Sequence, residues 1–70
     1  MSEYIINITW DSEASVWFAV CDDIPLSLES GSFDALVERV KIAVPEILQI
    51  NGGNPKCVLR FIAERKDGVA

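Results

Sequence analysis

Apolar and polar residues alternate along two stretches of the chain, Tyr4–Trp10 and Lys56–Glu64. A period of two residues places successive side chains on opposite faces of an extended backbone, so both stretches are predicted to be strands. Leu26–Ser30 alternates over a shorter length directly after Pro25. Because proline cannot donate a hydrogen bond to a neighbouring strand, we predict that this third stretch is a short edge strand.

The stretch Val16–Cys21 differs from the others because it is apolar on both faces. Its two faces are formed by Val16, Phe18 and Val20 and by Trp17, Ala19 and Cys21. One helix can cover only one face of a small sheet, so the second face needs another chain or stays as an exposed apolar patch. We expect the face with Trp17 to lie under the helix, with the opposite assignment left open. A partner interface is then predicted at Ile5, Val16, Phe18 and Val20.

Residues after Gly31 show the three- and four-residue spacing of a helix with one apolar stripe. The stripe consists of Phe33, Leu36, Val37, Val40, Val44 and Ile47. Ser32 is a favourable N-cap, and Asp34 in the first turn complements the helix dipole. Pro45 lacks a backbone N–H, which predicts a kink or a break near Lys41–Pro45. Asn51-Gly52-Gly53 is then expected to end the helix.

The order of these elements, three strands, a helix and a fourth strand, predicts an α+β fold. The polar segment Asp11–Ser15 and the acidic segment Asp22–Pro25 would connect the first three strands as antiparallel neighbours. A right-handed helical crossover brings the fourth strand parallel to the first and beside it. We therefore predict a four-stranded sheet of spatial order 3-2-1-4, with the helix on one face and the other face open.

The composition adds a reason to expect protein partners. A chain of 70 residues forms one small domain. Half of its residues are apolar, which is high for a domain that buries only about 60% of its unfolded surface. Self-association as a homo-oligomer is the simplest way to bury the excess apolar surface. The net charge of −5 argues against nucleic acid as a direct ligand and favours a basic protein partner, unless it serves solubility alone.

Candidate catalytic and metal-binding residues are few. Histidine is absent, which removes the commonest general base. Asp11 and Glu13 would lie about 20 Å from Asp22 and Asp23, at the other end of a six-residue strand, too far to share a metal ion. We predict no catalytic, cofactor or metal site, and no membrane association. The start of the chain shows no secretion signal, so we expect a cytoplasmic protein.

The two cysteines are predicted to remain reduced. Cys21 belongs to the second predicted strand and Cys57 to the fourth, with the first strand between them. Two strand spacings amount to roughly 9–10 Å, which exceeds the reach of a disulfide. A cytoplasmic location would also keep the thiols reduced.

The corner Asp23-Ile24-Pro25, the hairpin before it and the helix opening at Gly31-Ser32 together resemble the HicB-like antitoxin family. The similarity is closest to a short subgroup of unknown function, and it extends through Val44–Leu48 and Arg60-Phe61, although Leu26 stands where the family usually has glycine. The resemblance implies a partial RNase H-like fold without the acidic metal quartet of a nuclease.

For function, the resemblance implies a non-enzymatic, homo-oligomeric, protein-binding domain that neutralises a small basic RNA-cleaving toxin. The alternative is an orphan homo-oligomeric structural or regulatory module without a toxin partner. We predict a single HicB-like domain over residues 1–70, with a frayed tail at residues 65–70.

Overall fold

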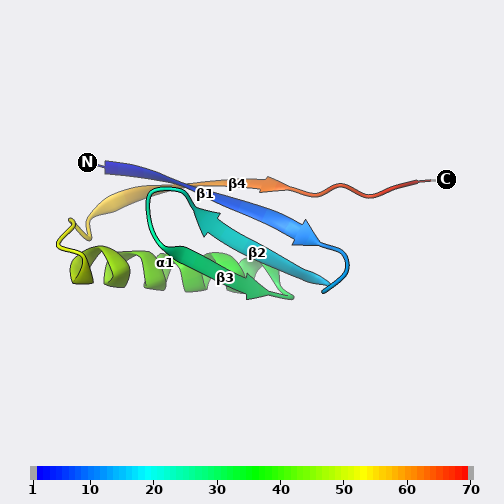
Figure 1. Cartoon of the computed structure of the whole chain (residues 1–70), viewed down its shortest axis with the longest axis horizontal. Coiled ribbons are helices and arrows are strands. Elements are labelled where there is room, and N and C mark those ends of the chain that lie inside the picture. The colour runs from blue at the N-terminus through cyan, green and yellow to red at the C-terminus, as the bar shows by residue number, and fades with distance from the viewer. Residues whose placement is uncertain (1, 70) are drawn as a thin grey trace.

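Four strands and one helix make up the structure, a computed structural model that describes residues 2–69 (Figure 1). The elements are β1 (Ser2–Asp11), β2 (Val16–Cys21), β3 (Leu26–Ser30), α1 (Phe33–Ile50) and β4 (Cys57–Glu64). The sheet has the order β3-β2-β1-β4, antiparallel from β3 to β1 and parallel between β1 and β4. The predicted α+β architecture, with strand order 3-2-1-4 and the helix on one face, is confirmed.

The turn between β1 and β2 is shaped by the side chain of Asp11. Its Oδ1 accepts hydrogen bonds from the backbone N–H groups of Glu13, at 3.0 Å, and Ala14, at 3.3 Å. Ser15 completes the turn with a left-handed φ of 55°. These side-chain bonds hold the turn together in the absence of the Asn-Gly pair that favours the tightest hairpins.

The corner between β2 and β3 is a tight turn centred on Pro25. The backbone N–H of Leu26 donates to the carbonyl of Ile24 at 2.7 Å, and the fixed φ of proline suits such a three-residue turn. The side chains of Ile24 and Leu26 are 4% and 5% exposed. The corner therefore contributes two apolar side chains to the core.

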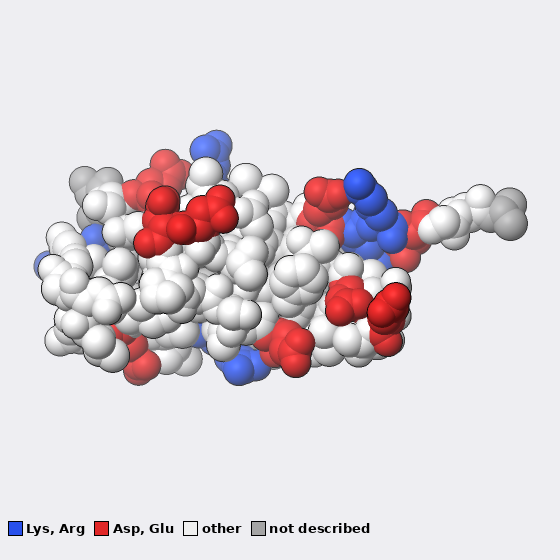
Figure 2. Space-filling view, in the orientation of Figure 1, with Lys and Arg blue, Asp and Glu red and all other residues white. Residues whose placement is uncertain are grey.

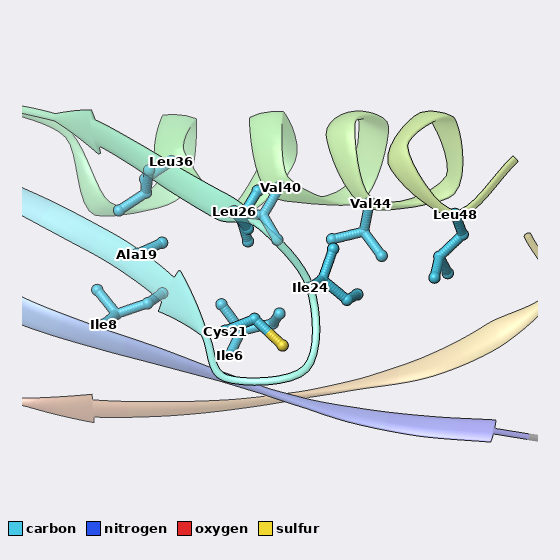
Figure 3. Close-up of a cluster of buried hydrophobic side chains, with 10 residues drawn as sticks. All are labelled: Ile6, Ile8, Ala19, Cys21, Ile24, Leu26, Leu36, Val40, Val44 and Leu48. Atoms are coloured by element: carbon cyan, nitrogen blue, oxygen red, sulfur yellow. The ribbon is translucent and has the colours of Figure 1, made fainter. Parts of the chain in front are cut away.

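A single apolar core lies between α1 and one face of the sheet (Figure 3). Figure 3 shows the helical side chains pointing toward the strands, with Ile24 between the two layers. The buried residues are Ile6, Ile8, Ala19, Cys21, Ile24, Leu26, Leu36, Val40, Val44 and Leu48. Ala19 and Cys21 are in this core and Trp17 packs against it. The expected assignment of the two faces of β2 is thus confirmed.

Of the kink or break predicted near Lys41–Pro45, the break does not occur, because α1 continues through Pro45 to Ile50. An internal proline removes one helical hydrogen bond and costs about 3 kcal/mol in an exposed helix. Here Val44 and Leu48, on either side of Pro45, are buried against the sheet. We attribute the continuity of the helix to this burial, which holds both flanking turns in place.

Both ends of α1 are capped as the sequence predicts. At the start, Ser32 Oγ accepts a hydrogen bond from the N–H of Ala35 at 3.3 Å. At the end, the N–H of Gly53 donates to the carbonyl of Leu48 at 2.7 Å, and the N–H of Gly52 donates to that of Gln49 at 3.3 Å. This pair of bonds is a Schellman motif, which needs a left-handed residue; Gly52 has a φ of 78°.

Replacing Gly52 with alanine is expected to lower the free energy of unfolding by about 1 kcal/mol, because a Cβ disfavours the left-handed conformation. No other atom lies within 4 Å of the added Cβ, so the effect isolates backbone strain. Thermal denaturation measures the loss. Gly68→Ala in the C-terminal segment, where an added Cβ also meets nothing within 4 Å, is the control and should leave the melting temperature unchanged. Equal melting temperatures for Gly52→Ala and the wild type would contradict the assignment of the cap.

Candidate functional site

The face of the sheet opposite α1 is not covered by any element within residues 2–69. All four residues predicted from the sequence lie on this face. Ala19 is buried in the core, and successive side chains of a strand point to opposite faces. Phe18 and Val20 therefore face outward, and Val16 follows the same alternation. Their β1 neighbours are Asp11, Thr9 and Asn7, and Ile5 continues that row with 43% of its surface exposed.

Strand β4 extends the apolar surface with two residues that the sequence reasoning did not select. Val58 and Ile62 lie beside Glu3 and Asn7 of β1, and each is 48% exposed. The sequence pattern did not decide which face of β4 joins this surface, because both faces of the strand carry large aliphatic residues. We call the complete apolar surface the open face, formed by Ile5, Val16, Phe18, Val20, Val58 and Ile62.

Charged residues on the same side of the sheet lie mainly at the margin of the open face. Glu29 is opposite Phe18, on the outer strand β3, and Glu64 is opposite Thr9, on the outer strand β4. Arg60 is an exception, because it lies opposite Ile5 and between Val58 and Ile62, with its Nε 3.9 Å from Glu3 Oε1. Figure 2 shows acidic side chains at the edges of a wide uncharged surface on one side of the molecule. The apolar residues of β2 with Glu29 beside them suit a partner with basic flanks.

The acidic residues do not form a metal site within residues 2–69, where no group of three potential ligands occurs. Asp11 and Glu13 lie at the turn before β2, and Asp22 and Asp23 follow its other end. The predicted separation of the two pairs is therefore confirmed. The carboxylate of Asp11 is also engaged by the backbone of its own turn.

Cys21 and Cys57 are free thiols on strands that both flank β1. Cys57 is opposite Ser2, whereas Cys21 lies one position beyond the pair Val20 and Asn7. The two residues are therefore separated along the strands as well as across the sheet. The predicted separation of the thiols is confirmed.

A shallow groove of about 330 Å³ runs between α1 and β4 on the core side of the sheet. It exists because α1 packs mainly against β3 and β2, while Cys57, Leu59 and Phe61 of β4 are only partly buried. The groove is lined by Lys41, Pro45, Pro55, Cys57, Leu59 and Phe61. The sequence reasoning missed it. Its lining contains a single charged group, Lys41, so it offers apolar contact and no set of converging catalytic groups.

An aromatic cluster fixes the end of the sheet near the first turn. The ring centroids of Trp10 and Trp17 are 5.2 Å apart, and those of Trp17 and Phe33 are 5.1 Å apart. The guanidinium carbon of Arg65 lies 4.4 Å from the centroid of Trp10. Although residues 65–69 form no strand or helix, Arg65 is held by this cation–π contact. Residue 70 of the predicted tail lies outside the described residues.

Within residues 2–69, no helix combines the length and apolar character that crossing a membrane requires.

Comparisons with known proteins agree with the fold. A sequence model of a family described as "Domain of unknown function (DUF1902)" matches residues 3–69. The crystal structure of a hypothetical protein from the extremely thermophilic bacterium Thermus thermophilus is similar, with a TM-score of 0.73 and 29% sequence identity. The similarity covers 97% of each chain. A search of curated proteins found no match.

Proposed function

Because the chain belongs to the DUF1902 family, whose description assigns no activity, we propose its function from its own surface. We propose a non-enzymatic, HicB-like protein-binding domain. In this proposal it acts as an antitoxin that binds and neutralises a small basic RNA-cleaving toxin in the cytoplasm.

The observation that carries the proposal is the open face. Three of its aliphatic residues, Ile5, Val58 and Ile62, expose between 43% and 48% of their surface. Ile5 lies on β1, one step diagonal to Val20, whereas Val58 and Ile62 lie on β4, across β1 from Phe18 and Val20 with Asn7 and Thr9 between them. This much exposed apolar surface on one face of a small domain favours a site where another protein binds.

The charge distribution favours a basic partner. The chain has a net charge of −5, and Glu29 and Glu64 flank the open face on the two outer strands. Opposite potentials accelerate encounter and select among partners. A protein that cleaves RNA needs a cationic surface to hold phosphates, and an acidic domain is complementary to such a surface.

Two further features support a HicB-like domain in particular. The corner Asp23-Ile24-Pro25 forms a defined turn whose Ile24 reaches the core, and the strand order agrees with a partial RNase H-like fold. The separation of the acidic pairs by the length of β2 favours binding over nuclease chemistry.

Replacing Phe18 with lysine is expected to abolish neutralisation of the toxin. The test co-expresses this protein with the product of a small basic reading frame adjacent to its gene, and measures growth and co-purification. The wild type should restore growth. Phe18→Lys should weaken binding by about 100-fold, because it puts a charge in the centre of the apolar surface and repels a basic partner. A new lysine beside Glu29 is compatible with the sheet.

The matched control is Ile42→Lys, which adds the same charge at an aliphatic residue on α1 that is 64% exposed. This variant should still restore growth, and both variants should keep the wild-type circular dichroism spectrum. Failure of the wild type to restore growth would refute the antitoxin role. Equal loss with both variants would refute the assignment of the open face.

The open face also supports the second candidate, a homo-oligomeric module without a toxin. In that case a copy of the same chain covers Phe18, and the protein self-associates through this face. Sedimentation of the Phe18→Lys variant distinguishes the two candidates. A smaller oligomer for this variant than for the wild type, with no basic protein co-purifying with the wild type, would favour the module.

A further inference from the structure

We infer that two copies of this chain pair edge to edge through β4, antiparallel, with Ile62 facing Ile62 of the second copy. The two sheets then form one eight-stranded sheet. This pairing uses the edge of the sheet and covers only Ile62 of the open face, so Phe18 and Val20 stay available to the partner proposed above.

The two edges of the sheet differ in how well they are protected. The edge strand β3 has five residues, and the carbonyl of Glu29 accepts a hydrogen bond from Arg39 Nη1 of α1 at 2.9 Å. The edge strand β4 has eight residues. Within residues 2–69, no side chain donates to or accepts from its main chain. Unpaired main-chain groups along a long edge are a template for another strand.

Symmetry restricts how β4 can pair with its own copy. An antiparallel pair of identical strands has a two-fold axis perpendicular to the sheet. Two residues that are directly opposite each other point to the same face of the sheet. The two-fold axis must therefore pass beside one residue that is opposite its own copy. Each choice of this central residue fixes every other pair. The register can therefore be selected from the charges on the strand.

Among the residues of β4, Cys57–Glu64, only a centre at Ile62 brings opposite charges together. Arg60 and Glu64 lie two positions on either side of Ile62. With this centre, each Arg60 is opposite Glu64 of the second copy. A centre at Arg60 or at Glu64 would oppose like charges, which destabilises a pair of strands. A centre at Phe61 would place Arg60 opposite Ile62 and leave both charges without a partner.

The register also covers apolar surface. Ile62, which is 48% exposed in one chain, packs on its own copy at the axis. Residues 60–64 of the two chains overlap, which is an ordinary length for a strand. Within residues 2–69, the ion-pair partners of Arg60 and Glu64 are exposed, at 3.9 Å and 3.4 Å. Exposed ion pairs add little affinity, so we assign them to register and the main-chain hydrogen bonds to binding.

Cysteine cross-linking tests the pairing. In a Cys57→Ser background, Ile62→Cys should form a disulfide-linked dimer under mild oxidation, because directly opposite residues have Cα atoms about 4.5–5.5 Å apart. Val58→Cys is the matched control. Val58 lies on the same strand and face as Ile62 and has the same exposed fraction of 48%. In the inferred register, however, Val58 and its copy lie eight positions apart along the paired strands, which is about 26 Å.

Cross-linking at Ile62 and not at Val58 supports the inferred register. Cross-linking at Val58 and not at Ile62 would overturn it. A monomer in sedimentation at micromolar concentration, with no cross-link in either variant, would overturn the pairing itself.

Charge reversal provides a second measurement that does not depend on cysteine chemistry. Arg60→Glu and Glu64→Arg should each weaken dimerisation roughly tenfold, because each turns two attractive pairs into repulsive ones. The double variant Arg60→Glu/Glu64→Arg should restore the wild-type dissociation constant. Two single variants as strong as the wild type, or a double variant as weak as the singles, would refute the register.

Discussion

Replacing Leu36 with alanine is expected to unfold a large fraction of the protein. Leu36 is fully buried between α1 and the sheet. Truncation of a buried leucine removes about 2–5 kcal/mol, whereas a domain of this size has a total stability of about 4–10 kcal/mol. The substitution therefore removes a large share of the free energy of unfolding. Urea denaturation followed by circular dichroism measures the shift of the midpoint.

The control for this prediction is Ile42→Ala on the same helix. Ile42 is 64% exposed, and surface substitutions usually change stability by less than about 0.5 kcal/mol. A similar loss in both variants would mean that helix propensity, and not burial against the sheet, determines the stability of α1.

Truncation of Trp17 to alanine should have the second largest effect, a loss of about 3 kcal/mol. Its ring contacts Trp10 on β1 and Phe33 at the start of α1, with centroid distances of 5.2 Å and 5.1 Å. The substitution therefore separates β1 and β2 from the first turn of the helix. The near-ultraviolet circular dichroism of the remaining aromatic residues should also weaken.

Trp17→Phe is the matched variant, because it keeps an aromatic ring between Trp10 and Phe33. It should lose no more than about 1.5 kcal/mol. Comparable losses for the two variants would indicate that the indole as a whole, through its size or its N–H group, is required. Unchanged stability in Trp17→Ala would refute the structural role of the cluster.

Local patterns predicted most of the fold, for reasons that particular residues make clear. Val16–Cys21 and Leu26–Ser30 were predicted with the bounds that the structure has, because polar turns and Pro25 delimit them. Strand β1 begins at Ser2, two residues before the predicted start at Tyr4. The alternation of apolar residues fades there, and pairing with Cys57 and Val58 of β4 extends the strand. The start of β1 is therefore set by pairing with a strand distant in sequence, which the local pattern does not show.

Pro45 and the groove beside β4 show why the remainder could not be predicted. The local effect of Pro45 is to weaken a helix, but burial of Val44 and Leu48 holds α1 together across it. The groove depends on where the helix lies over the sheet, since α1 packs mainly on β2 and β3 and covers Leu59 and Phe61 only in part. No periodicity in one strand or one helix encodes that lateral placement.

The candidate site was predicted in part. The pattern of Val16–Cys21 indicated that one apolar face would remain uncovered, and Phe18 and Val20 do face away from the helix. It did not identify Val58 or Ile62, because β4 carries aliphatic residues on both of its faces. The pairing of β4 with β1 decides which of these two faces joins the open face.

The parallel pairing of β1 with β4 has a consequence for the synthesis of the chain. From Ser2 and Cys57 to Thr9 and Glu64, all partners in this ladder are 55 residues apart (57 − 2). At about 5–20 residues per second, β1 waits roughly 3–11 s on the ribosome before β4 is made. Throughout this interval one edge of β1 is free to pair with other nascent chains. The last strand therefore determines when this edge of β1 stops being available to other chains.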